Sequence, residues 1–203
     1  MLKLFHQVVQ KTYDTMIHLS SRPNAMWFLF IVAFAESSFF PIPPDVMLIP
    51  MVLATPNKAW RIAGLATVAS VIGGYFGYGI GIFAFDLIAK PILEFYNAFS
   101  QFQEFEHYYH EYGAWIVFGA GITPFPYKII TIASGVVHLD LVVFTVASVL
   151  ARGMRFFLVA WLLKKYGAPM KIFIEKNLGI LSVLFLILLI GGFAALKYFS
   201  AAS

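Results

Sequence analysis

The sequence of 203 residues contains no cysteine, and charged residues make up only 12% of it, about half of the share found in soluble domains. Without cysteine the chain has no disulfide framework, no thiolate metal site and no cysteine nucleophile. Apolar residues make up 61% of the sequence, and a soluble body of this size has too little interior to bury them. We therefore expect an integral membrane protein, whose net charge of +4 marks a membrane face and indicates no nucleic-acid partner.

Sequence motifs of enzymes are also missing. The chain has no glycine-rich phosphate loop and no His-Glu-x-x-His motif, which in enzymes hold a phosphate or a catalytic zinc ion. One histidine pair, His107 and His110, has a spacing that suits a metal ion on a helix, but acidic and aromatic residues surround it. We expect no enzyme activity, no metal and no cofactor.

Three apolar runs are long enough to cross a bilayer as helices. The clearest, 177–196, has twenty residues and no charge, which corresponds to about 30 Å of helix and to the thickness of the hydrocarbon core. The run 62–85 is also uncharged, and the run 141–163 carries two arginines near its middle. We predict three full spans, with 177–198 as the C-terminal transmembrane helix.

Prolines stand at the centre of two further apolar stretches, 25–54 and 115–137. The prolines predicted to form hairpins are Pro41, Pro43, Pro44, Pro124 and Pro126. Because proline removes a backbone donor and disfavours helix in the residue before it, we predict that each stretch enters the membrane, turns and returns as a re-entrant hairpin. Non-helical backbone at membrane depth needs protein or water around it, so the hairpins imply a protected interior. The alternative is two ordinary spans with a proline kink.

Two segments and the distribution of charge predict the membrane interfaces. Residues 1–24 and 91–112 mix apolar and polar side chains at helical spacing, which favours amphipathic helices that lie in the interface. The connection 164–177 holds four lysines and one acid, whereas the stretch 86–140 holds six acids and two lysines. By the positive-inside rule, we expect the lysine-rich connection in the cytoplasm and the acidic stretch outside.

The two halves of the chain resemble each other, as repeats 25–85 and 91–163. Residues 66–71 (Ala-Thr-Val-Ala-Ser-Val) match residues 144–149 (Phe-Thr-Val-Ala-Ser-Val) in five of six positions. One full span in each half reverses the direction of the chain, so the second copy is inverted, as in many secondary transporters. The predicted fold is an all-α integral membrane protein with a single transmembrane domain over 1–203, built as an inverted repeat of two re-entrant hairpins.

Five charged side chains fall within the apolar stretches: Glu36, Asp45, Lys128, Arg152 and Arg155. Charges at this depth are costly and usually pair or face a polar interior. Because the planar donor fork of arginine suits phosphate, we predict that the three cations bind a phosphate headgroup and that the two acids carry protons. The simpler alternatives are structural ion pairs for Glu36 and the arginines, a helix cap at Asp45, and a Lys128 that only reaches the headgroups.

Four glycines of the second predicted span, Gly73, Gly74, Gly77 and Gly81, form one group. The superposed repeats put Gly74 and Gly77 at the places of the two arginines of the third span. Small residues at this spacing let helices approach closely or leave room for a ligand. We expect the group to serve helix packing.

Several of these motifs resemble the DedA family of membrane proteins, also called the SNARE-associated or VTT domain family. The resemblance in the first half lies in 34–36 (Phe-Ala-Glu), 41–45 (Pro-Ile-Pro-Pro-Asp) and the glycines followed by Tyr78. The second half is similar to the YqaA-like branch in 123–128 (Thr-Pro-Phe-Pro-Tyr-Lys), 133–135 (Ala-Ser-Gly) and 151–157 (Ala-Arg-Gly-Met-Arg-Phe-Phe). The likeness covers about residues 25–167.

This resemblance implies two opposed re-entrant hairpins and a role in moving lipids, notably undecaprenyl phosphate in bacterial envelope synthesis. It also implies proton coupling in some members, scramblase behaviour in eukaryotic relatives, and an embedded acidic pair that corresponds to Glu36 and Asp45. Typical bacterial members have one arginine three residues before the proline of the second hairpin and another three residues after it. Counted from Pro124, this chain has Gly121 and Tyr127 at these positions. Our candidates for the missing positive charge are Lys128 and the arginine pair.

We therefore predict a multi-pass protein of the bacterial inner membrane that translocates an anionic lipid, foremost undecaprenyl phosphate, and is coupled to protons. Its expected partners are membrane lipids and protons, and a homo-oligomer is compatible with this hypothesis. The alternatives are a non-selective phospholipid scramblase and a non-transporting membrane scaffold or chaperone.

Overall fold

The computed structural model describes residues 20, 22–40, 43–95, 99–123, 125–167 and 169, and this part of the chain is helical without a β-strand. The elements are α2 (Ala25–Ser38), α3 (Asp45–Ala54), the 3-10 turn η1 (Pro56–Lys58), α4 (Ala59–Ala84), the π-helical turn η2 (Phe85–Ala89), α5 (Lys90–Phe95), α6 (Phe99–Ile122), α7 (Tyr127–Val136) and α8 (Leu141–Tyr166). The predicted C-terminal span 177–196 and most of the predicted interfacial helix 1–24 lie outside the described residues, as do Pro41 and Pro124.

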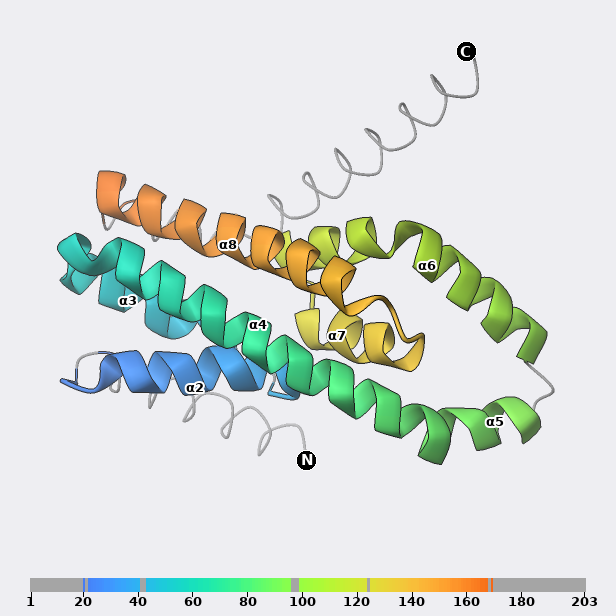
Figure 1. Ribbon diagram of the computed structural model, residues 1–203. Helices are drawn as coiled ribbons and strands as arrows, with labels where there is room; N and C mark the ends of the chain where they lie inside the picture. Colours follow the sequence, from blue (N-terminus) through green and yellow to red (C-terminus); the bar gives the residue numbers. More distant parts are fainter. Residues whose placement is uncertain are drawn as a thin grey trace, which may run out of the picture.

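Two long helices, α4 and α8, run antiparallel along the molecule (Figure 1). Near the start of α4, Trp60 stacks on Phe157 in the second half of α8, with ring centroids 5.9 Å apart. Further along α4, the hydroxyl of Tyr75 lies 2.6 Å from the hydroxyl of Thr145 in the first turns of α8. The helices α2, α3, α6 and α7 pack against one or both of these two helices.

The segments Pro56–Ala84 and Leu141–Tyr166 are long and apolar enough to cross a bilayer. The helices α4 and α8 have 26 residues each, about 39 Å of helix against a hydrocarbon core of roughly 30 Å. The predicted spans 62–85 and 141–163 fall on these two helices. One face of α8 exposes a continuous apolar stripe, as expected for a surface solvated by lipid: Val142, Val146, Leu150, Met154 and Leu158.

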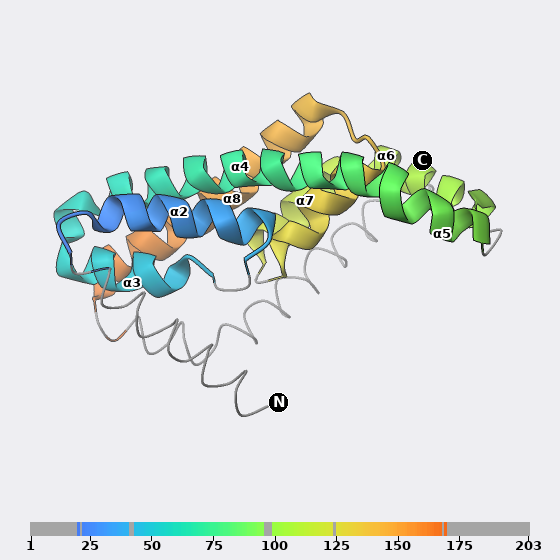
Figure 2. The same cartoon turned by 90° about the horizontal axis from the view of Figure 1, so that it is seen from below.

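The chain reverses between α2 and α3, at the first group of prolines. The helix α2 ends at Ser38, and α3 begins at Asp45, directly after Pro43 and Pro44. Proline suits this place because the first N–H groups of a helix have no intrahelical partner. Figure 2 shows α2 and α3 next to each other along α4. Their apolar faces join α4 and α8 in one core, which includes Leu29, Met47, Leu48, Val52, Ile62, Ala66, Phe156 and Leu163.

The second reversal lies between α6 and α7, after which α7 begins directly behind Pro126. The structure corrects one predicted boundary here. We expected an interfacial helix over 91–112 that ends before the hairpin, but residues 99–112 belong to α6 and continue without a break to Ile122. Gly113, at the expected boundary, lies within α6 and packs against Leu139, whose Cδ1 lies 2.5 Å from the place that a Cβ on Gly113 would take, so there is no room for a side chain here.

Four glycines of α4, the predicted group of Gly73, Gly74, Gly77 and Gly81, lie where other helices touch it. A Cβ on Gly73 would overlap the carbonyl oxygen of Phe34 in α2, and a Cβ on Gly81 would overlap the carbonyl oxygen of Ile132 in α7. Such close approach of two backbones requires the absence of a side chain. Gly77 likewise faces Thr131 of α7 and Ser37 of α2, and a Cβ on Gly74 would lie 3.3 Å from the ring of Phe144.

The two chain reversals meet each other beside α4. Lys128 Nζ, in the first turn of α7, donates to the carbonyl oxygen of Phe40 at 3.2 Å. Thr131 Oγ1, one turn further, donates to the carbonyl oxygen of Ser37 at 3.0 Å. We call this meeting place of α2, α3, α7 and α8 the junction. Re-entry of the two reversals into a membrane and the inverted repeat stay predictions.

Candidate functional site

At the junction, each embedded acid binds one arginine of α8. Arg152 Nη2 lies 2.6 Å from Glu36 Oε2, and Arg155 Nη2 lies 2.5 Å from Asp45 Oδ2. The arginines share a face of α8 because they are three residues apart. Glu36 comes from α2 and Asp45 from the first turn of α3. The structure therefore brings four of the predicted site residues together as two ion pairs.

The Glu36–Arg152 pair is deeply enclosed. The side chain of Arg152 is 1% exposed and that of Glu36 is 12% exposed. The Nε of Arg152 donates to Ser70 Oγ at 2.6 Å, and its guanidinium lies over the rings of Tyr127 and Phe156, 4.9 and 4.7 Å from their centroids. The flat, weakly hydrated guanidinium suits such a place between aromatic rings.

The Asp45–Arg155 pair has fewer neighbours and more solvent. Its side chains are 14% and 11% exposed, respectively. Besides Asp45, Arg155 contacts the carbonyl oxygen of Thr123, to which its Nη1 donates at 2.9 Å. Thr123 directly follows the end of α6 at Ile122. Arg155 therefore links the start of α3 to the connection between α6 and α7.

Lys128 is the third cation at the junction. Its Nζ donates to the carbonyl oxygen of Phe40, and it forms no ion pair with any residue that the structure describes. Three cations against two carboxylates leave one positive charge. Each arginine faces its own carboxylate, so among the described residues of the junction the surplus positive charge lies on Lys128.

Buried hydroxyl groups support the ion pairs, and our sequence analysis assigned them no role. Ser37 Oγ lies 2.6 Å from Ser70 Oγ and 3.3 Å from Glu36 Oε2. The hydroxyl of Tyr127 donates to Ser148 Oγ. Ser70 and Ser148 occupy the same place in the matching sequences 66–71 and 144–149. The internal repeat was therefore the signal that could have identified them.

Within the described ranges, no group of three or more histidine, aspartate or glutamate side chains could hold a metal ion. Of the predicted histidine pair, His110 lies on the surface of α6, with its Nε2 4.0 Å from Glu106 Oε1 one turn away.

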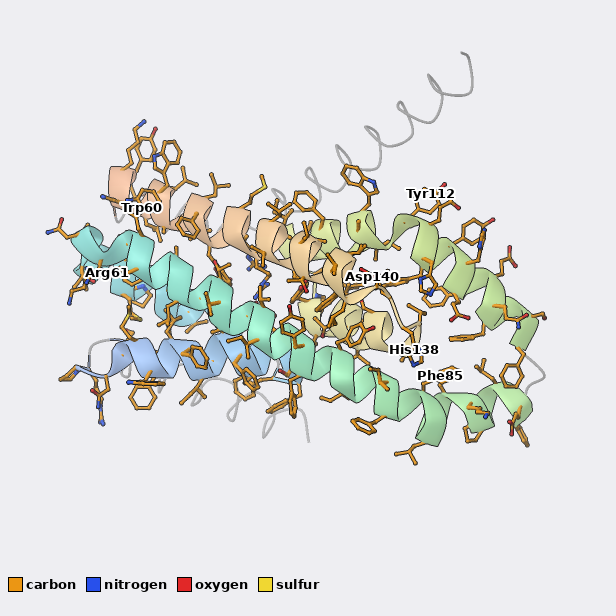
Figure 3. The ribbon with its side chains drawn as sticks, in the orientation of Figure 1. Trp60, Arg61, Phe85, Tyr112, His138 and Asp140 are labelled. Carbon is orange, nitrogen blue, oxygen red and sulfur yellow. The ribbon has the colours of Figure 1, made fainter. Side chains whose placement is uncertain are left out.

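Charges outside the junction separate along the molecule. Trp60 and Arg61 lie at one end, and Asp140 and Tyr112 lie toward the other (Figure 3). Lys164 belongs to the first end, where its Nζ lies 5.3 Å from the centre of the Trp60 ring. Lysine and tryptophan together are typical of a membrane–water interface. Lys164 thus lies at a different part of the molecule from Asp140, and the orientation in the membrane stays a prediction.

Comparison with known proteins identifies a family and two relatives. Residues 42–165 match the family described as the VTT domain. An uncharacterized protein of Haemophilus influenzae is 36% identical over 167 residues, which cover 80% of this chain and 86% of that protein. An uncharacterized homologue from Histophilus somni is 41% identical over 168 residues, which cover 80% of this chain and 87% of that protein. No solved structure matches the chain.

Proposed function

Because the chain belongs to the VTT domain family, which is the DedA family that its motifs resemble, we propose that it is a membrane transporter for an anionic lipid. The foremost substrate is undecaprenyl phosphate, and the protein carries it between the leaflets of the bacterial inner membrane as a multi-pass transporter and not as an enzyme. The resemblance supplies the lipid class. The observations at the junction support the phosphate chemistry.

One observation carries the proposal, namely the two arginine–carboxylate pairs beside a lysine without a carboxylate partner among the described residues. Arginine binds phosphate and carboxylate through the same pair of parallel donors. A phosphate that reaches the junction can therefore replace a carboxylate on an arginine while Lys128 neutralises its second charge. The junction thus contains groups that bind a phosphate and groups that release it.

Exchange of this kind also couples transport to protons. A carboxylate that loses its guanidinium inside an apolar protein is stabilised by taking up a proton, and it releases the proton when the guanidinium returns. The two carboxylates that the junction offers for this role are Glu36 and Asp45. In our proposal, each arrival of a phosphate headgroup is accompanied by uptake of a proton at the displaced acid.

We propose further that α2–α3 and α6–α7 form the re-entrant hairpins of an inverted repeat. The helix α2 has 14 residues, and α3 and α7 have 10 each. These lengths correspond to roughly 15–21 Å, too short for a hydrocarbon core of about 30 Å. Hairpins that enter from opposite faces would meet inside the membrane, and their meeting place would be the junction.

The test is transport in liposomes that carry a fluorescent polyprenyl phosphate. We expect the purified protein to accelerate movement of the lipid between leaflets and a pH gradient to change the rate. The double substitution Arg152→Ala/Arg155→Ala should reduce movement to the rate of protein-free liposomes. Lys164→Ala/Lys165→Ala is the matched control, because it removes two cations from the same helix outside the junction, and it should keep the rate. Gel filtration of each variant verifies that it is folded.

The same assay separates the alternatives. Equal movement of phosphatidylcholine and polyprenyl phosphate without an effect of the pH gradient would support a non-selective scramblase. No movement above protein-free liposomes, with a folded protein, would support a membrane scaffold or chaperone. Transport that survives the double arginine substitution would refute the phosphate role of the arginines.

A further inference from the structure

The two ion pairs of the junction differ in how firmly they are held. The Glu36–Arg152 pair belongs to a closed ring of hydrogen bonds whose directions follow from chemistry. Arginine only donates and an ionised carboxylate only accepts. Ser37 gives its only proton to Glu36 Oε2, so it accepts from Ser70, and Ser70 in turn accepts from Arg152 Nε. Arg152 Nη2 donates to the same oxygen of Glu36 and closes the ring.

This ring joins α2, α4 and α8 through four side chains, and it leaves none of their buried polar atoms without a partner in the described part of the chain. Removing the Glu36 carboxylate from Arg152 would break two of the four bonds of the ring and leave Arg152 Nη2 and the Ser37 hydroxyl without their acceptor. Groups of this kind cost much more to leave unpaired than their hydrogen bonds gain when formed. The Glu36–Arg152 pair is therefore poorly suited to exchange its carboxylate for a ligand.

The Asp45–Arg155 pair has no such ring. Among the described residues, Asp45 is the only side chain that hydrogen-bonds to the guanidinium of Arg155, and the other partner is the backbone carbonyl of Thr123. Both side chains of the pair are more exposed than that of Arg152. When Asp45 leaves, Arg155 keeps its contact with Thr123, and only one charged contact has to be replaced.

We propose that the carboxylate of Asp45 occupies the site on Arg155 to which the phosphate of the ligand binds. Asp45 is therefore an intramolecular competitor of the substrate. This inference rests on the proposed function, and it assigns a different role to each of the two ion pairs. Arg155 and Asp45 exchange partners, with Lys128 at the same junction as the second cation for phosphate. Arg152 and Glu36 stay closed and hold α2, α4 and α8 together, with Ser37 and Ser70 as positioning residues.

A competitor has a signature that a mere binding residue does not have, because its removal tightens binding. We expect Asp45→Asn to lower the Kd for phosphate by about tenfold, the equivalent of one lost charged hydrogen bond that the ligand no longer displaces. The same substitution should slow transport, because the bound phosphate no longer meets a carboxylate that returns Arg155 to its resting partner.

The experiment measures the rise of Tm with increasing ligand concentration, from which the Kd follows because only the folded protein binds the ligand. The probes are inorganic phosphate and a short-chain polyprenyl phosphate in detergent. Glu36→Gln and Ser70→Ala should lower the Tm without any gain in phosphate affinity. Ser38→Ala is the matched control, since the buried hydroxyl of Ser38 bonds, within the described part of the chain, only to the carbonyl oxygens of Phe34 and Gly73. Its Kd should equal that of the wild type.

The outcomes distinguish this inference from the proposed function. Tighter phosphate binding in Asp45→Asn supports the competitor, and it does so even if polyprenyl phosphate is neither bound nor moved, in which case the lipid function fails alone. Unchanged or weaker phosphate binding in folded Asp45→Asn, or a gain of the same size in Glu36→Gln, overturns the competitor. Transport by the wild type would then leave the proposed function standing.

Discussion

Gly73→Ala tests how closely α2 approaches α4. A Cβ at position 73 would overlap the carbonyl oxygen of Phe34 and come within 2.8 Å of its Cα. These atoms belong to the backbone of α2 and cannot rotate away as the end of a side chain could. The methyl group can be accommodated only if α2 moves away from α4, and Ser38, which donates to the carbonyl oxygen of Gly73 at 2.8 Å, would then lose part of that contact.

The magnitude follows from two opposing terms. Overpacking of a tight contact costs about 1–3 kcal/mol, whereas alanine is favoured over glycine in a helix by roughly 0.5–1 kcal/mol. The net loss is on the order of 1–2 kcal/mol. In a chain of 203 residues, each kcal/mol shifts Tm by about 2–4 °C, so we expect a fall of roughly 2–8 °C.

Gly79→Ala is the matched control, because a Cβ at position 79 of the same helix would meet no atom within 4 Å. Here only the helix propensity changes, so Tm should rise by about 1–4 °C. The assay is thermal unfolding of both variants in the same detergent, followed by the loss of the monodisperse peak in gel filtration. If Gly73→Ala and Gly79→Ala shift Tm in the same direction by similar amounts, the close α2–α4 contact is refuted.

Three further predictions concern the junction and the orientation. Ser70→Ala removes the acceptor of Arg152 Nε and should lower the free energy of unfolding by about 1–3 kcal/mol, measured as a fall in Tm, whereas Ser70→Thr, which keeps the hydroxyl, should lower it less. Tyr127→Phe removes the hydrogen bond to Ser148 but keeps a ring beside Arg152, so it should cost only about 1 kcal/mol, and a loss as large as that of a broken ion pair would contradict the described packing. Because the chain has no cysteine, Lys165→Cys and Glu104→Cys can be labelled singly in cells. A membrane-impermeant maleimide added outside should label Glu104→Cys and not Lys165→Cys. Labelling of both variants from one side would refute the predicted orientation.

Much of the fold was predictable because its signals are local. The two candidate membrane-spanning helices follow from long uncharged or nearly uncharged apolar runs. The chain reversals follow from prolines, which disfavour helix continuation. The continuity of α6 was missed for the same reason. The expected boundary at 112 lies where the mixed polar and apolar segment gives way to the apolar stretch 115–137, and α6 runs through this local change to Ile122.

The sequence by itself determined that this protein is helical, that much of its surface is apolar, and that five charges lie in apolar stretches. Composition and residue spacing indicate these properties without information on which residues meet in the folded chain. Only the tertiary structure decided which charges meet. Glu36 and Arg152 are 116 residues apart, and Asp45 and Arg155 are 110 apart, so their pairing depends on how α2 and α3 pack on α4 and α8. The same packing places Ser37 and Ser70 around one pair and leaves the other with a backbone carbonyl, and this difference in hydrogen bonding separates an anchoring pair from one that can exchange its partner.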